Sequence, residues 1–168
     1  TASQIETFIP QFFRESGDYL SLLHFRIALE AEACYLAAIN ATYKDIQILE
    51  QILDDLELHR DDLEYYSKND FDFHLRIAEC CNNKLIYSMV QMIRILIGDV
   101  FANFVYEYGN YESINSHRKI LESIKTADSE GARRWMHKHL TTVVERYSLV
   151  NKSSHIKIKR KSNCDINE

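Results

Sequence analysis

The sequence predicts an all-α protein that folds as one domain. Its 168 residues include only 4 glycines and 1 proline, the residues that tight turns between strands need most. Hydrophobic residues make up 46% of the chain and charged residues 27%, a balance typical of a globular protein rather than a disordered one. Apolar residues recur at helical spacing along most of the chain, and its length is sufficient for one substantial core.

The first part of the chain predicts three helices. Residues 3–14 form a short amphipathic helix that Pro10 interrupts, and a long helix covers residues 18–41. Thr42 and Asp45 have the spacing of a capping box, which starts the third helix. The apolar positions of this third helix recur at helical spacing: Ile46, Leu49, Leu53, Leu56 and Leu63.

Four more helices are expected after these. Asn69 is predicted to cap the next helix, and a long helix follows Asn82 and ends near residue 109. The last two helices cover residues 112–126 and 129–151. We therefore expect six helices and a short additional first one. The predicted organisation is an N-terminal helix and linker (residues 1–17), a helical bundle (18–151) and a polar tail (152–168).

Charge, hydropathy and cysteine usage exclude several classes of protein. The net charge is −5, whereas a protein whose whole surface binds nucleic acid is positively charged. The most apolar stretch, residues 85–106, contains Arg94 and Asp99, which favours a buried helix over a membrane span. The four cysteines form no CxxC pair, as expected for reduced thiols in a cytoplasmic protein.

Two polar side chains lie on the apolar face of the helix that contains residues 69–81. Asp70 and His74 are one helical turn apart, and they share that face with four apolar residues: Phe73, Ile77, Ala78 and Cys81. This spacing allows an aspartate and a histidine to bind one metal ion together. Asp55 and His59 have the same spacing, but they lie at the edge of their apolar stripe, where a solvated face is the better interpretation.

Two more histidines are related by the turn between the last two helices. His117 lies eleven residues before Asp128 and His139 eleven residues after it. Residues equidistant from the turn of an antiparallel helix pair lie at the same height, so the two imidazoles are expected to face each other. His137, on the other side of its helix, is expected to face solvent.

Together these residues offer three imidazoles and one carboxylate for a divalent metal. The alternative is that each is a hydrogen-bonded residue of the core, and the residues alone leave both interpretations open. Arg26 also has two interpretations: an ion pair with Glu30, one turn away, or a fork that binds an anionic ligand. The absence of an ExxH motif is evidence against a di-iron carboxylate enzyme.

Five motifs follow one another along the chain: RIALEAEACYLAA (26–38), NDFDFH (69–74), IAECCNNKLI (77–86), SHRKILESI (116–124) and ARRWMHKHL (132–140). In this order they resemble the C-terminal effector-binding (FCD) domain of FadR-type regulators of the GntR family. The resemblance covers residues 19–144. Ser123 stands where that family usually has alanine, and Cys80 and Cys81 replace small residues.

The resemblance implies an antiparallel helical bundle with a central pocket for a ligand and a metal. It implies that one divalent ion, which we expect to be Zn²⁺ or Ni²⁺, is held by a set that matches the family's ligands: Asp70, His74, His117 and His139. Arg26 and Asn83 are the expected ligand-binding residues. A positively charged metal centre favours a small carboxylate, such as a hydroxy acid or a sugar acid.

The expected function is that of a metabolite-sensing and dimerisation domain of a transcription regulator, without catalytic residues. We expect a homodimer with no membrane association. We also expect operator DNA to be bound only through an N-terminal winged helix-turn-helix that lies outside these 168 residues. The alternative is a helical metalloenzyme acting on a small carboxylate, which would require a general base beside the metal, and the sequence offers no strong candidate.

Overall fold

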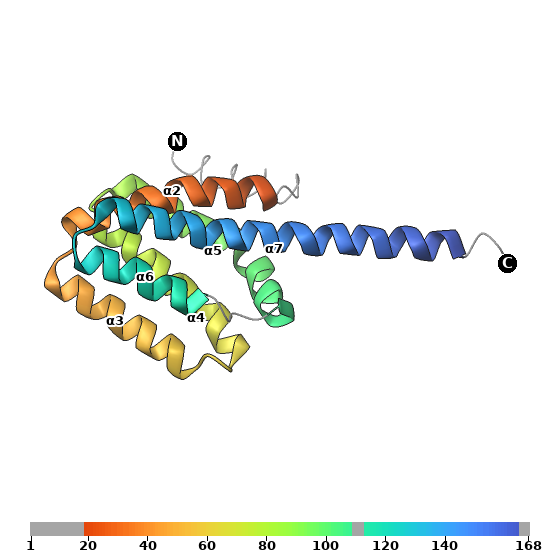
Figure 1. Cartoon of the computed structure of the whole chain (residues 1–168), viewed down its shortest axis with the longest axis horizontal. Helices are drawn as coiled ribbons and strands as arrows, with labels where there is room; N and C mark the ends of the chain where they lie inside the picture. Colours follow the sequence, from red (N-terminus) through yellow and green to blue (C-terminus); the bar gives the residue numbers. More distant parts are fainter. Residues whose placement is uncertain (1–18, 109–112, 165–168) are drawn as a thin grey trace.

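The computed structural model describes residues 19–108 and 113–164, which form six α-helices and no strands (Figure 1). The all-α prediction is therefore confirmed. The short helix predicted at residues 3–14 lies outside the described residues. The six helices are α2 (Tyr19–Asn40), α3 (Tyr43–Leu58), α4 (Leu63–Cys80), α5 (Lys84–Tyr108), α6 (Ser113–Lys125) and α7 (Ser129–Cys164).

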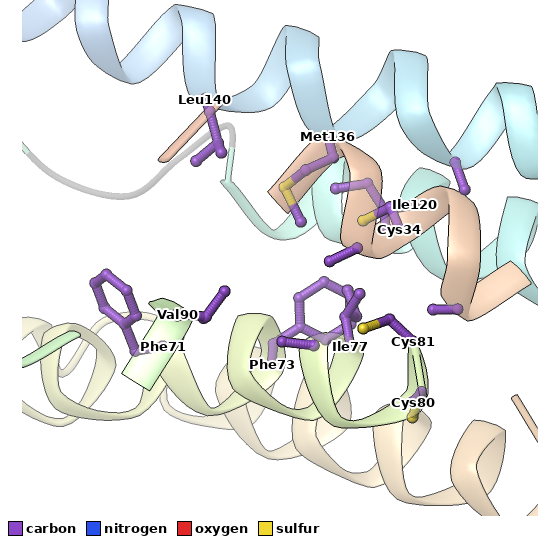
Figure 2. Close-up of a cluster of buried hydrophobic side chains, with 14 of the residues drawn as sticks. Cys34, Phe71, Phe73, Ile77, Cys80, Cys81, Val90, Ile120, Met136 and Leu140 are labelled. Carbon is purple, nitrogen blue, oxygen red and sulfur yellow. The ribbon is translucent and has the colours of Figure 1, made fainter. Parts of the chain in front are cut away.

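Helix α2 is central to the packing, because it lies along α7 and also contacts α4, α5 and α6. Helix α4 packs against α3 and α5, and α6 packs against α3 and α7. In Figure 2, apolar side chains of α4 such as Phe73 and Ile77 face Met136 and Leu140 of α7 across the core. All four are almost completely buried. The core thus fills the space between α4 and the α6–α7 pair, where the candidate site also lies.

The boundary between α3 and α4 differs from the prediction. Thr42 and Asp45 form the predicted capping box at the start of α3. However, α3 ends at Leu58, and Leu63 is the first residue of α4. The side chain of Asp62 caps α4 by accepting a hydrogen bond from the backbone N–H of Tyr65, so the helix begins well before the predicted cap.

Asn69 therefore does not cap α4, and that prediction was wrong. It lies inside the helix, where its Nδ2 donates to the backbone carbonyl of Tyr65 at 2.7 Å. An asparagine side chain can bond to nearby backbone groups both at the start of a helix and inside it, so asparagine alone does not mark the start. Asp62 precedes Asn69 in the chain, and its carboxylate caps the helix there.

The turn between α6 and α7 is centred near Asp128, as predicted. The Oδ1 atom of Asp128 accepts a hydrogen bond from the backbone N–H of Gly131 at 2.9 Å. A Cβ atom at Gly131 would lie only 1.9 Å from Oδ2 of Asp128, so a larger residue there would require the carboxylate of Asp128 to move. Ala127 adopts a left-handed conformation (φ 55°), which reverses the chain. The antiparallel pair that results sets the heights of His117 and His139.

Helix α7 is longer than predicted, because it continues to Cys164 instead of ending near residue 151. Its sequence contains no proline and no glycine after Gly131, so no residue strongly opposes the helix. Figure 1 shows α7 projecting well beyond the other helices. Over the described residues, no helix has the combined length and hydropathy needed to span a membrane.

Candidate metal centre

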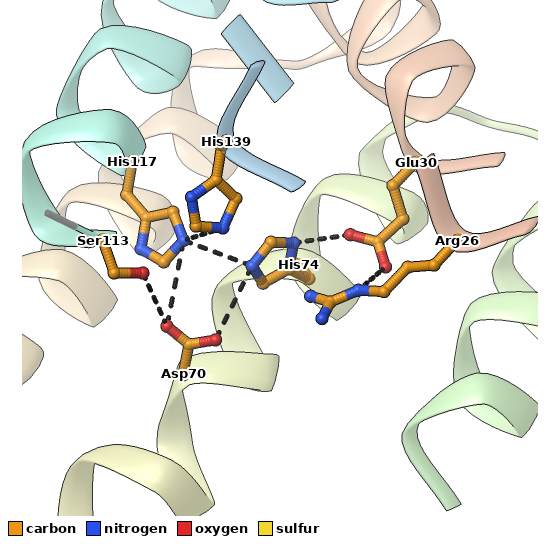
Figure 3. A network of polar contacts seen from close by, with 7 residues as sticks. All are labelled: Arg26, Glu30, Asp70, His74, Ser113, His117 and His139. Atoms are coloured by element: carbon orange, nitrogen blue, oxygen red, sulfur yellow. Dashed lines mark hydrogen bonds and ion pairs between the residues drawn. The ribbon is translucent and has the colours of Figure 1, made fainter. Parts of the chain in front are cut away.

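The four predicted metal ligands come together inside the bundle (Figure 3). Asp70 and His74 project from α4, His117 from α6 and His139 from α7. Their exposed fractions are between 0% and 6%. His137 is exposed, as the helical periodicity predicts. Three helices therefore contribute polar side chains to one buried point.

The imidazole nitrogens converge closely. His117 Nε2 lies 3.2 Å from His74 Nε2 and 3.2 Å from His139 Nε2. Each imidazole offers one nitrogen to a group whose members all lie within 4.8 Å of one another. The carboxylate of Asp70 is next to this group, with Oδ2 at 3.7 Å from His74 Nε2 and Oδ1 at 3.8 Å from His117 Nε2.

These separations fit a metal-binding group. Two nitrogens that each lie about 2.0–2.1 Å from one Zn²⁺ ion are separated by about 2.8–3.4 Å for octahedral to tetrahedral angles. The observed 3.2 Å falls within this range. Asp70 Oδ2 is buried and has no hydrogen-bond partner among the described residues, which is costly for a carboxylate oxygen unless a cation satisfies it. The residues present therefore fit a divalent ion such as Zn²⁺ or Ni²⁺.

Burial keeps two of the imidazoles in the form that binds metals. It lowers the pKa of His117 well below 6.5, with a further contribution from the neighbouring His74. The pKa of His139 is lowered in the same way by burial, followed by the charges of His117 and His74. A neutral imidazole has a free lone pair on one nitrogen, so both residues are ready to act as ligands near neutral pH.

An ion pair on α2 supports the site from the other side. Arg26 Nε donates to Glu30 Oε1 at 2.6 Å, and Glu30 Oε2 contacts His74 Nδ1 at 2.5 Å. Burial on its own would raise the pKa of Glu30, but the charges of Arg26 and His74 outweigh it and lower this pKa to about 2. The ion pair between Arg26 and Glu30, one of the two interpretations of Arg26, is present, and both residues are only 1% exposed.

Sequence reasoning missed two contacts of the site: the one between Glu30 and His74, and the one between Ser113 and Asp70. Ser113 Oγ, at the start of α6, donates to Asp70 Oδ1 at 3.4 Å. The signal for Glu30 was its place on the inner face of α2, one turn after Arg26. Helical periodicity gives this face but does not identify the partner on α4.

Other candidate residues lie apart from this network. Asn83 is exposed, and its Oδ1 caps α5 by accepting from the backbone N–H groups of Leu85 and Ile86. These are local contacts of a helix start, and its role in ligand binding stays a prediction. Asp55 and His59 pair at 3.5 Å with side chains that are 47% and 38% exposed, consistent with a partly solvated face.

Comparison with known families gives a match that covers most of the chain. The sequence model of the FCD domain matches residues 21–142. The matched segment begins in α2 and ends in α7, so it includes all four candidate ligands.

Several relatives are transcription regulators. The Uxu operon regulator of Haemophilus influenzae is 30% identical over 129 residues, which are 73% of this chain and 48% of the relative. The uncharacterised HTH-type transcriptional regulator YcbG of Bacillus subtilis is 26% identical over 123 residues, with 73% and 52% coverage. The HTH-type transcriptional repressor NanR of Citrobacter rodentium is 28% identical over 149 residues, with 82% and 57% coverage. The chain spans about half the length of these relatives.

Solved structures share the fold. GntR of Streptococcus agalactiae superposes with a TM-score of 0.65 and 24% identity, covering 75% of this chain and 57% of that protein. McbR/YncC of E. coli gives a TM-score of 0.67 and 21% identity, covering 77% and 67%. At this level of identity the likeness concerns the helical architecture.

Proposed function

The chain belongs to the FCD domain family, and we propose that it senses a small carboxylate through a bound divalent metal. The relatives are named as an operon regulator, an HTH-type regulator and an HTH-type repressor, which supports a sensory role over a catalytic one. The observation that carries the proposal is the convergence of three buried imidazole nitrogens, with His117 Nε2 at 3.2 Å from two others.

In this proposal the metal is held by Asp70, His74, His117 and His139. Three neutral imidazoles and one carboxylate leave a divalent ion with a net charge of about +1, and an ion that takes more than four ligands keeps coordination positions open for the effector. When bound, the ion supplies a positive centre that attracts the ligand's carboxylate. A hydroxy acid or sugar acid suits this centre, because its hydroxyl group and its carboxylate can bind together.

Arg26 is the proposed second contact for the carboxylate. Figure 3 shows its guanidinium pointing from α2 toward His74, and it pairs with Glu30 through Nε. A guanidinium is always charged and presents several N–H donors in a plane, which matches the geometry of a carboxylate. Arg26 is almost completely buried, so an anion here would meet its charge with little screening.

Operator binding and dimerisation are proposals about a longer regulator, because the chain spans about half the length of its relatives. We propose that such a regulator is a homodimer that binds DNA through a winged helix-turn-helix outside these residues. Metal and carboxylate would tie α4, α6 and α7 together and shift the population of conformations that set the spacing of the two DNA-binding domains.

The test uses the 168-residue chain without a histidine tag. Metal is removed with a chelator, and thermal unfolding is then measured with and without added Zn²⁺ or Ni²⁺. A ligand at 100 times its Kd stabilises the folded state by about 2.7 kcal/mol, which corresponds to a rise in Tm of about 5–11 °C for a protein of this size. A screen of small organic acids on the metal-loaded chain then tests for a further saturable rise.

His137 and His139 provide a matched pair of variants two residues apart on α7. His139→Ala should abolish most of the rise in Tm, whereas His137→Ala, at an exposed position, should leave it unchanged. No rise in the wild-type chain, or an equal loss in both variants, would contradict the metal site. Turnover of a small carboxylate by the metal-loaded chain would favour the metalloenzyme alternative.

A further inference from the structure

We infer that Glu30 is a positioning residue for the metal centre: it fixes the tautomer and the orientation of His74. This inference rests on the proposed function and extends it to a residue on α2, a helix that contributes none of the four candidate ligands.

The geometry of Glu30 divides its two oxygens between two partners. Oε1 accepts from Arg26 Nε at 2.6 Å, and Oε2 lies 2.5 Å from His74 Nδ1. The side chains of Glu30 and His74 are 2% and 0% exposed, so water does not compete for this contact. Arg26 in turn keeps Glu30 in place, since both oxygens of the carboxylate are engaged.

The chemistry of the contact determines which nitrogen of His74 carries the proton. An ionised carboxylate only accepts hydrogen bonds, so Nδ1 of His74 must be the donor. In the neutral imidazole the lone pair is then on Nε2, the atom that lies 3.2 Å from His117 Nε2 and 3.7 Å from Asp70 Oδ2. A histidine that binds a metal through one nitrogen commonly donates its other N–H to a carboxylate, which fixes the ring and makes the ligand nitrogen more basic.

His117 shows that the support from Glu30 is specific. Its Nε2 also points into the centre, but its Nδ1 is buried without a hydrogen-bond partner among the described residues. The outer side of His117 is therefore held by packing, with its ring centroid 4.6 Å from that of Phe73, whereas the outer nitrogen of His74 is held by a charged hydrogen bond. Loss of Glu30 should accordingly affect metal binding through His74.

The experiment compares Glu30→Gln with Glu32→Gln in metal-free chains. Glu32 is on the same helix, but it pairs with Arg133 at 2.6 Å on a surface where its side chain is 45% exposed. The affinity for Zn²⁺ is measured by calorimetric titration, and the visible spectrum of the Co²⁺-loaded chain reports the ligand geometry. We expect Glu30→Gln to weaken Zn²⁺ binding about 10- to 100-fold and to change the Co²⁺ spectrum, and Glu32→Gln to change neither.

A second measurement does not depend on any variant folding. Nitrogen-15 NMR of the histidine side chains in the wild-type chain should show the proton of His74 on Nδ1, both without metal and with Zn²⁺. Zn²⁺ binding within twofold of wild type in Glu30→Gln, or a wild-type His74 protonated on Nε2, would overturn the inference. Failure of the wild-type chain to bind any divalent metal would instead refute the proposed function, and the NMR measurement would still test the Glu30–His74 contact.

Discussion

Acidification of the metal-free chain should reduce its stability through two buried histidines. The pKa values of His117 and His139 lie well below 6.5 in the folded protein, mainly because burial disfavours the charged imidazole. In the unfolded chain the same groups titrate near 6.5. As the pH falls below about 6.5, the unfolded state therefore takes up protons that the folded state does not, and the free energy of unfolding decreases.

The expected size of this effect follows from proton linkage. A histidine that stays neutral when folded loses about 2 kcal/mol of stabilisation between pH 7 and pH 5, so two such residues lose at most about 4 kcal/mol together. The pKa of Glu30 is lowered from 4.5 to about 2, so its own stabilising contribution is lost only at pH values below about 4.5. Between pH 7 and pH 5 the loss of stability therefore comes from the histidines and not from Glu30.

The assay is urea denaturation in the presence of a chelator, at several pH values in this interval. His139→Gln should remove about half of the pH dependence, because it removes one of the two buried imidazoles, and His137→Gln, at an exposed position two residues away, is the matched control. Equal free energies of unfolding for the wild-type chain at pH 7 and pH 5 would refute the reasoning. So would a His137→Gln variant that loses as much pH dependence as His139→Gln.

Three further predictions concern the parts of the fold that hold the site, each measured as the free energy of unfolding in urea. Thr42→Ala should cost about 1 kcal/mol, because it removes the capping box of α3. Phe73→Ala should cost about 3–5 kcal/mol because Phe73 is fully buried, whereas Ile95→Ala, at a position 77% exposed, should cost less than about 0.5 kcal/mol. Arg26→Met should cost about 3–5 kcal/mol, since it leaves the carboxylate of Glu30 buried without this guanidinium; a loss below 1 kcal/mol would contradict the importance of the pair.

The sequence predicted the elements of the site better than their contacts. The positions of His117 and His139 followed from their equal distance to Asp128, because an antiparallel pair with a short turn has little freedom in register. Periodicity likewise distinguished buried His139 from exposed His137. These predictions succeeded because each depends on one helix or on one turn.

The errors have local causes. The α3–α4 boundary was misplaced because Leu63 continues the apolar spacing of α3, although Asp62 caps a new helix. The end of α7 was placed too early, because polar composition does not stop a helix in the absence of glycine or proline. The link between Glu30 and His74 joins residues 44 positions apart on two helices, and a helical period specifies a face but not the partner across the core.

The candidate site forms a layer of polar side chains buried inside the helical bundle. Arg26, Glu30, Asp70, His74 and His117 are each no more than 1% exposed, in a bundle whose core is otherwise mostly apolar. Well-packed apolar side chains in place of a buried ion pair are often neutral or more stable, and a buried carboxylate oxygen without a hydrogen-bond partner is a cost that folding alone does not offset. Stability therefore does not account for this layer. A bound cation at the convergence of the imidazoles would satisfy Asp70 Oδ2 and the histidine lone pairs together. Binding sites in helical bundles are built from such inward-facing polar side chains, which weaken the core when no ligand is bound.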